Sequence, residues 1–238
     1  MESFFAQLAT LPGVLAVKLG GSRARGEERP DSDWDVGLYY RESLRALDPA
    51  DLRALGQPGE VVEIGDWGPV MNGGAWLQVD GQRVDVLYRD LDAIEQRIAE
   101  AERGHFDILH LPGYLANVPT YMVLGELAHG RVLHGIELPR PEFPPALRER
   151  AARRWRSEAD FALMYAGTYA TRAARAECLA MLTRAALAAA HSRLAARGEW
   201  ALNEKRLLVR AGLGELGEMF AGAVDLVELC ARVRALCA

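Results

Sequence analysis

The sequence predicts an α+β protein, in which a small mixed β-sheet with flanking helices is followed by an α-helical bundle. Short β-rich runs separated by turn residues fill the first half of the chain. Two of these runs flank Asp80-Gly81, a pair that is the strongest short-range signal for a hairpin. Beyond four prolines within residues 138–145, long stretches rich in alanine and leucine are typical of helices. We therefore predict two domains, residues 1–140 and residues 141–238.

The composition is that of an ordinary globular protein. Of the 238 residues, 50% are hydrophobic and 26% are charged, which allows a sizeable core. Residues 1–140 hold 13 basic and 22 acidic residues, whereas residues 141–238 hold 15 basic and 11 acidic residues. This split suits a site that holds cations in one part and attracts an anion in the other, and solvated surface charge explains it equally well.

The start of the sequence and the cysteines indicate a cytoplasmic protein. "MESFFAQLATLPG" places an acid where a signal peptide has positive charge, and no apolar run approaches the length of a membrane span. We therefore expect no membrane partner. Cys178, Cys230 and Cys237 lack metal-ligand spacing, so we expect reduced thiols in helices.

In the first half we expect helices and strands in mixed order. A short helix over residues 2–10 ends at Pro12-Gly13, and a strand covers residues 14–19. "DVGLYY" forms a second strand, and a helix begins at about Ser43 with its leucines on one side. Residues 60–65 form a third strand.

The clearest hairpin follows in "GAWLQV" and "QRVDVLY", on either side of Asp80-Gly81. A helix then begins near Asp90, which is a good N-cap, and ends at Gly104. From about Asn117 the pattern predicts helices, interrupted by the prolines. Two long helices follow, the second ended by Gly198, and two shorter helices complete the chain.

Two aspartates near the start of the second strand carry the strongest chemical signal. Successive side chains of a strand alternate between its faces, so Asp33 and Asp35 point the same way while Trp34 and Val36 point to the other face. Two unpaired carboxylates this close repel one another unless a cation lies between them. Magnesium, a hard cation that prefers oxygen ligands, is the natural occupant.

A glycine turn precedes these aspartates. Gly20 and Gly21 let the backbone approach a ligand without side-chain obstruction, and the amides around Ser22 can donate to phosphate oxygens. The segment matches neither the Walker loop nor the GxGxxG fingerprint. The order of the elements makes the glycine turn informative. A strand leads into the Gly-Gly-Ser turn, Asp-x-Asp lies on the next strand, and one more acid lies on a later strand.

Residues from about Val14 to Tyr88 resemble the nucleotidyltransferase superfamily, which includes β-type DNA polymerases, antibiotic nucleotidyltransferases and the minimal nucleotidyltransferases of toxin–antitoxin pairs. The match is to its glycine-serine motif, here Gly20 to Ser22, followed by two aspartates that alternate with hydrophobic residues, here Asp33 and Asp35. The third carboxylate of the family lies on a strand of a following hairpin, and Asp85 in "RVDVLY" takes that place.

The resemblance implies a two-metal transfer of a nucleoside monophosphate from a nucleoside triphosphate, with ATP expected, to a hydroxyl acceptor. Asp33 and Asp35 would hold two Mg²⁺ ions about 4 Å apart, with Mn²⁺ as a possible substitute. Asp85 would complete the metal site on the nucleophile side and accept the hydroxyl proton. Gly20, Gly21 and Ser22 would bind the triphosphate, with Arg23 or Arg25 as charge partner and Lys205 reaching the nucleotide from the helical domain.

Several assignments have a structural alternative. Arg23 and Arg25 can equally pair with neighbouring acids at the surface. The run "RERAARRWR" (148–156) suits a solvated helix face better than a nucleic-acid contact. Core packing or partial burial is the stronger expectation for Trp67, Trp76 and Tyr39, which can also line an acceptor pocket.

The acceptor and the oligomeric state are not defined by the sequence. A small molecule is favoured because the acidic overall charge disfavours binding to a long polyanion. One alternative function is polymerase-like transfer to a DNA or RNA 3′ end, which the basic second half supports. The other is a non-catalytic nucleotide-binding or antitoxin-like partner protein.

Overall fold

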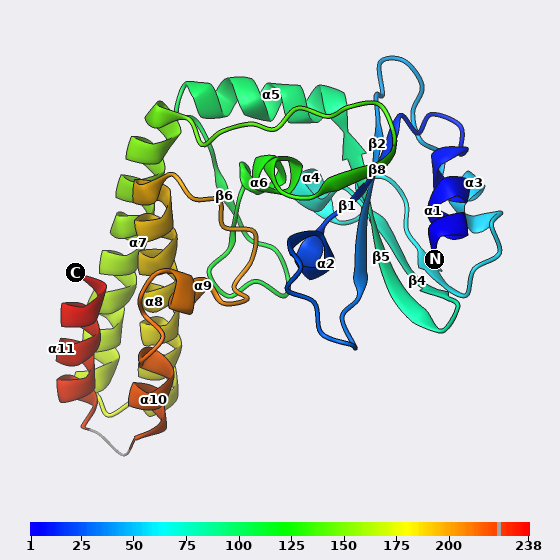
Figure 1. Ribbon diagram of the computed structural model, residues 1–238. Coiled ribbons are helices and arrows are strands. Elements are labelled where there is room, and N and C mark those ends of the chain that lie inside the picture. Colours follow the sequence, from blue (N-terminus) through cyan, green and yellow to red (C-terminus); the bar gives the residue numbers. More distant parts are fainter. Residues whose placement is uncertain (223–224) are drawn as a thin grey trace. The chain divides into compact units, whose positions relative to one another are not determined.

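The protein is described by a computed structural model that covers residues 1–222 and 225–238, apart from the side chain of Arg25. It divides into two compact units (Figure 1). The first unit comprises Met1–Ala99 and Val123–Glu142, and the second comprises Glu100–Met122 and Phe143–Ala238. The assignment of separate roles to residues 1–140 and 141–238 stays a prediction.

A six-stranded mixed sheet forms the centre of the first unit. Its strand order is β3-β4-β5-β2-β1-β8; β2 and β5 are parallel, and the other neighbours are antiparallel. The predicted α+β fold class is confirmed. The strands are β1 (Ala16–Leu19), β2 (Trp34–Tyr40), β3 (Gly59–Val61), β4 (Gly74–Val79), β5 (Gln82–Asp90) and β8 (Arg131–Gly135).

One face of this sheet is the hydrophobic core of the first unit. Val17, Val36 and Leu38 are fully buried there and lie in one cluster with Phe5 and Leu8 of helix α1 (Glu2–Ala9). The predicted hairpin is also confirmed, because β4 and β5 are joined by Asp80 and Gly81 with φ angles of 51° and 74°. Positive φ at both positions is the requirement of a type I′ turn.

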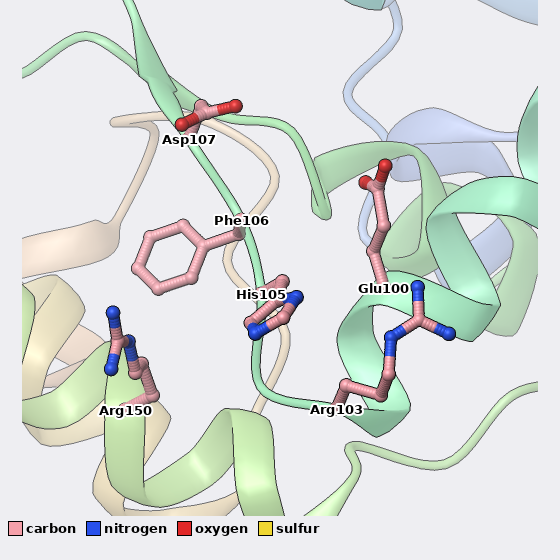
Figure 2. Close-up of a pocket in the computed structure, with 6 residues that line it drawn as sticks. All are labelled: Glu100, Arg103, His105, Phe106, Asp107 and Arg150. Carbon is pink, nitrogen blue, oxygen red and sulfur yellow. The ribbon is translucent and has the colours of Figure 1, made fainter.

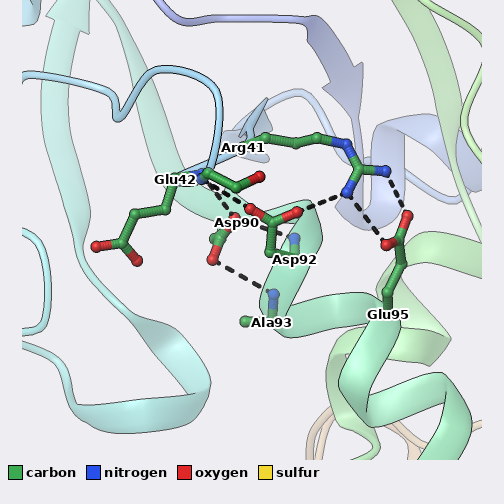
Figure 3. Close-up of polar contacts among 7 residues, drawn as sticks. Arg41, Glu42, Asp90, Asp92, Ala93 and Glu95 are labelled. Atoms are coloured by element: carbon green, nitrogen blue, oxygen red, sulfur yellow. Dashed lines mark hydrogen bonds and ion pairs between the residues drawn. The ribbon is translucent and has the colours of Figure 1, made fainter.

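The helix predicted from Ser43 is wrong. The helix in this region, α3, is confined to Pro49–Arg53 and is capped by Asp48. The backbone amides of residues 42 and 43 are bonded to the carboxylates of Asp90 and Asp92, so they fix a turn rather than a helix start (Figure 3). Arg41 reinforces this turn through ion pairs with Asp92 and Glu95. The predicted cap of the later helix, α5 (Leu91–Glu102), is confirmed, because the Asp90 carboxylate accepts from the amides of residues 92 and 93.

The uniformly helical pattern predicted from Asn117 is also wrong. Asn117 has a positive φ of 70°, and the short strand β7 (Val118–Pro119) pairs with β6 (Ile108–Leu109). Helix α6 (Met122–Ala128) is followed by β8, which forms the edge of the main sheet beside β1. Tertiary pairing with β1 determines this strand, and five residues are too few for a clear periodicity.

Helices dominate the second unit. α7 (Pro145–Thr171) packs along α8 (Arg175–Arg197), which ends at Gly198 with φ of 72°. Among the described residues, three shorter helices follow where we expected two: α9 (Leu207–Arg210), α10 (Leu216–Ala221) and α11 (Leu226–Cys237). The three cysteines are free and buried. Over the part of the chain that the structure describes, no helix combines the length and apolarity needed to cross a bilayer.

Candidate functional site

The polar residues of the sheet gather on the face opposite the hydrophobic core. Val36 and Leu38 of β2 point into the core, so the alternating residues Asp35, Gly37 and Tyr39 point to the opposite face. The strand register shows which residues of the neighbouring strands point to this face, since laterally paired residues share a face. Asp35 pairs with Asp85, Gly37 pairs with Leu87 and Lys18, and Tyr39 pairs with Arg89.

Asp35 and Asp85 therefore lie side by side on adjacent parallel strands. Their Cα atoms are register partners, and neighbouring strands are about 4.8 Å apart. Both side chains are half-buried. The register of the two strands brings Asp35 and Asp85 together, and this pairing of β2 with β5 is a long-range feature that the sequence alone did not show.

Asp33 precedes β2 and carries an ion pair. The Nε atom of Arg83 lies 2.6 Å from Asp33 Oδ1, without the geometry of a hydrogen bond. Oδ1 is buried and has no hydrogen-bond partner among the described residues. Arg83 is itself 61% exposed. The guanidinium of Arg83 thus supplies the positive charge beside Asp33, and its exposure leaves room for the side chain to move into solvent.

The Gly20–Ser22 turn lies directly against Asp35. The Gly20 amide donates to the Asp35 carbonyl at 2.8 Å, which continues the strand pairing of β1, and the short helix α2 (Gly21–Arg25) begins at the next residue. Gly21 has φ of 61°, and a β-carbon built on it would overlap Oδ2 of Asp35. Only glycine combines this backbone with this close approach. The first-turn amides of a helix have no intrahelical acceptor, so they can donate to an anion.

Arg23 holds the loop that carries Asp33. Its guanidinium donates to the carbonyls of Ser32 and Asp33, at 2.7 Å from Nη2 and 3.2 Å from Nε respectively. The same group lies over the Trp34 ring, 4.3 Å from the ring centroid. These contacts occupy the planar fork of Arg23 and fix the backbone of the loop.

The structure does not test the roles predicted for two nucleotide-binding residues, Arg25 and Lys205. Arg25 lies in α2, and its side chain is outside the described residues. Lys205 belongs to the second unit, where its amide donates to Asn203 Oδ1 at 2.9 Å and its side chain is exposed. Both nucleotide-binding roles stay predictions.

A buried cationic group on the same face of the sheet was missed from the sequence. Lys18 of β1 is only 4% exposed, and its Nζ atom donates to the carbonyls of Glu126 and Leu127 near the end of α6. Burial, reinforced by the charge of Arg140, lowers the pKa of Lys18 to about 8, although Glu126 opposes the shift. The signal in the sequence was a lysine inside the apolar run "VLAVKL".

Arg89 and Tyr39 extend this buried polar layer. Arg89 is 3% exposed and donates from Nε to Glu126 at 2.8 Å and from Nη1 to the Met71 carbonyl at 2.8 Å. Tyr39 is also buried, and burial raises the pKa of its hydroxyl above the ordinary value. Tyr39 is thus buried as expected, but on the face opposite the hydrophobic core cluster.

The carboxylates offer hard oxygen ligands, but they do not form a complete metal cage. Among the residues that the structure describes, no group of three or more Asp, Glu, His or Cys side chains has a geometry that could hold a metal ion. Mg²⁺ is commonly bound by one or two carboxylates together with substrate phosphates and water. The adjacent Asp35 and Asp85, with Oδ1 of Asp33, which carries an ion pair but no hydrogen bond, fit this mode of binding.

A separate cavity lies in the second unit. It has a volume of about 360 Å³, and none of the predicted site residues line it (Figure 2). Its lining mixes both charges and one aromatic ring: Glu100, Arg103, His105, Phe106, Asp107 and Arg150. Other arginines of the "RERAARRWR" run pair with acids on their own helix, as Arg153 does with Glu149 and Arg156 with Asp160. This pairing supports a solvated helix face for those arginines.

Comparison with known proteins gives a family match for part of the chain. Residues 1–100 match the family model of the nucleotidyltransferase domain. The predicted resemblance is thereby confirmed for this part of the chain, and this match supports nucleotidyl transfer as the general activity. No curated protein matches the sequence.

Among solved structures, the chain is similar to a nucleotidyltransferase-like protein from Exiguobacterium sibiricum 255-15. The two share 9% identity with a TM-score of 0.46, and the match covers 99% of this chain and 72% of the other.

Proposed function

We propose that the protein is a Mg²⁺-dependent nucleotidyltransferase that moves a nucleoside monophosphate from a nucleoside triphosphate, with ATP expected, to a hydroxyl acceptor. One observation carries the proposal. Within the residues that match the nucleotidyltransferase domain, Asp35 and Asp85 are lateral neighbours, and the Gly20–Ser22 turn lies against Asp35. Carboxylates therefore adjoin a glycine turn whose amides are suited to donate to phosphate oxygens.

The groups on this face have separate roles in binding the triphosphate, accepting a proton and holding cations. First-turn amides at Gly21 and Ser22 bind and orient the triphosphate. Asp85, on the side of Asp35 away from that turn, accepts the proton of the attacking hydroxyl. When bound, divalent cations would neutralise the charge that develops on the phosphoryl oxygens and the departing pyrophosphate. Asp33, Asp35 and Asp85 would hold these cations, with two Mg²⁺ ions expected and Mn²⁺ as a substitute.

Two arginines control the state of Asp33. Arg23 fixes the backbone on which Asp33 stands, through the carbonyls of residues 32 and 33. Arg83 neutralises the Asp33 carboxylate in the absence of a cation, and it must move before Asp33 binds one. Because Arg83 is largely exposed, this exchange costs a surface ion pair, about 0–1 kcal/mol, together with the long hydrogen bond from its Nη2 atom to the Asp31 carbonyl at 3.4 Å.

Labelled nucleotides test the proposal. ATP labelled in the α-phosphate is incubated with Mg²⁺ or Mn²⁺ and with a panel of hydroxyl compounds, primer-template DNA, tRNA and proteins. We expect label on a small acceptor, and no transfer by Asp35→Asn, which removes the charge and keeps the shape. Asp85→Asn should impair catalysis more than triphosphate binding. Extension of the primer would support the polymerase-like alternative, and full activity of Asp35→Asn would refute the assignment.

A further inference from the structure

A tryptophan continues the row of carboxylates across the sheet. Strand register pairs Asp35 with Asp85, Asp85 with Trp76 of β4, and Trp76 with Glu60 of β3. The Gly20 amide bonds to Asp35 at the other end of this row. Lateral partners share a face and have β-carbons about 5 Å apart. Trp76 therefore stands next to Asp85, on the side away from the glycine turn.

Trp76 belongs to an exposed aromatic pair. Its side chain is 50% exposed, whereas most large apolar residues of the first unit are buried. The ring of Trp67 lies against it, with centroids 4.6 Å apart and an interplanar angle of 34°. A β-carbon on Gly74 would press on the Trp67 ring, so the absence of a side chain at this position gives the ring its space.

Packing alone does not account for this arrangement. A tryptophan that only filled the core would be buried, as Trp155 is with 1% exposure. Trp67 supports Trp76 from one side and restricts its rotation, which leaves a pre-ordered aromatic surface facing solvent. Aromatic surfaces of this kind bind rings by stacking or by contact with the C–H face of a sugar.

We propose that Trp76, supported by Trp67, is the binding surface for a ring of the hydroxyl acceptor. The inference rests on the proposed function, because it takes Asp85 to be the carboxylate that receives the hydroxyl proton. With the triphosphate on the Gly20–Ser22 side of the row, the group beyond Asp85 is the acceptor. A ring on Trp76 places its hydroxyl toward Asp85.

The charge around Trp76 selects among ring-bearing acceptors. Glu60 and Asp85 flank Trp76 on its two lateral sides, and Glu60 is exposed. The exposed Glu60 carboxylate repels a phosphorylated ligand, whereas an aromatic face beside a carboxylate attracts a cation. The acceptor is therefore a small ring compound that is neutral or positively charged, and a nucleic-acid end is disfavoured.

Fluorine NMR of protein labelled with 5-fluorotryptophan tests the surface directly. The chain has five tryptophans, and single Trp→Phe variants assign their resonances. The probes are glucosamine, myo-inositol, glucose 6-phosphate and the acyclic polyol sorbitol. We expect the Trp76 and Trp67 resonances to shift with glucosamine most strongly and with inositol less. We expect little effect of glucose 6-phosphate or sorbitol, and unchanged resonances of the buried Trp155 and Trp200.

A variant and a matched control complete the test. Trp76→Leu should weaken glucosamine binding about fivefold to tenfold, while Phe161→Leu, at another exposed aromatic residue, should leave it unchanged. Absence of shifts with every probe, or equal shifts with sorbitol, would overturn the proposal. So would an identified acceptor whose KM is the same for Trp76→Leu and the wild type.

The two proposals fail separately. If the tryptophan resonances respond to ring compounds but no nucleotide is transferred to any acceptor, the proposed function is wrong, and Trp76 binds rings without the role of an acceptor surface. If transfer proceeds and depends on Asp35, while Trp76→Leu changes neither binding nor KM, the function stands and the acceptor surface is wrong.

Discussion

Gly21 combines a left-handed backbone with a close approach to Asp35, so Gly21→Ala separates backbone strain from damage to the carboxylates. Its φ is 61°, and an added β-carbon would overlap Oδ2 of Asp35. Gly26 ends the same helix, α2, with φ of 66° and has no atom within 4 Å of a built β-carbon. The two glycines thus share the strain, and only Gly21 has the contact.

The backbone strain determines the expected loss of stability, and the contact with Asp35 determines the expected loss of cation affinity. A non-glycine residue in the left-handed region costs about 1–2 kcal/mol, so both alanine variants should lose that much stability. For a chain of this size this corresponds to a fall in Tm of about 2–8 °C. In Gly21→Ala the Asp35 side chain must also rotate away from its present position. Misplacing a ligand in this way should lower cation affinity about 10–100-fold.

Thermal unfolding measures the cost of the backbone strain, and Mn²⁺ titration measures the effect of the contact with Asp35. Both variants should melt at similar temperatures in EDTA. Only Gly21→Ala should lose Mn²⁺ affinity and nucleotidyl transfer, while Gly26→Ala should keep both. Equal Mn²⁺ affinity in the two variants would refute the role given to Gly21, as would loss of activity in Gly26→Ala at a temperature where it is folded.

Three further outcomes are expected. Arg83→Gln frees Asp33 from its ion pair and should raise Mn²⁺ affinity about twofold to fivefold without nucleotide; unchanged or lower affinity in calorimetry would contradict the competition. Arg23→Lys removes the fork that binds two carbonyls and should weaken Mn²⁺ binding, whereas a rise only in the KM for ATP would mean that Arg23 binds phosphate. Burial lowers the pKa of His191 to about 4 from an ordinary 6.5, and the ring stacks on Trp155. Between pH 6.5 and pH 4 the imidazole of His191 is protonated in the unfolded chain but not in the folded chain. The free energy of unfolding of the wild type should therefore fall relative to that of His191→Phe as the pH falls from 6.5 to 4. A difference in urea-unfolding free energy between the two proteins that stays constant across that range would contradict this.

Local rules were sufficient where a few neighbouring residues determine the structure. The turn at Asp80-Gly81 needs two positive φ angles, and the pair of residue types that tolerates them is visible in the sequence. The alternation of Asp35 with the buried Val36 and Leu38 is likewise a property of one strand, whereas Asp33 lies just before that strand. These features allowed the α+β sheet and its hairpin to be predicted, and the role of the carboxylates stays a prediction.

Long-range contacts account for what the sequence did not show. The turn after β2 is held by Asp90 and Asp92, which lie 48 and 49 residues further along the chain, so the local leucine spacing was misleading. The pairing of Trp76 with Asp85 required the register of β4 and β5, and the parallel pairing of β2 with β5 joined it to Asp35. Similarly, the ion pair of Arg83 with Asp33 follows from that parallel pairing, because residue 83 is then carried alongside residue 33.

The structure of the protein with Mn²⁺ and a non-hydrolysable ATP analogue tests the central claim most directly. Anomalous scattering locates Mn²⁺ independently of the protein atoms. We expect Mn²⁺ bound by Asp35 together with Asp33 or Asp85, Arg83 displaced from Asp33, and the triphosphate on the amides of the Gly20–Ser22 turn. Triphosphate bound elsewhere, or Mn²⁺ that contacts none of the three aspartates, would contradict the account.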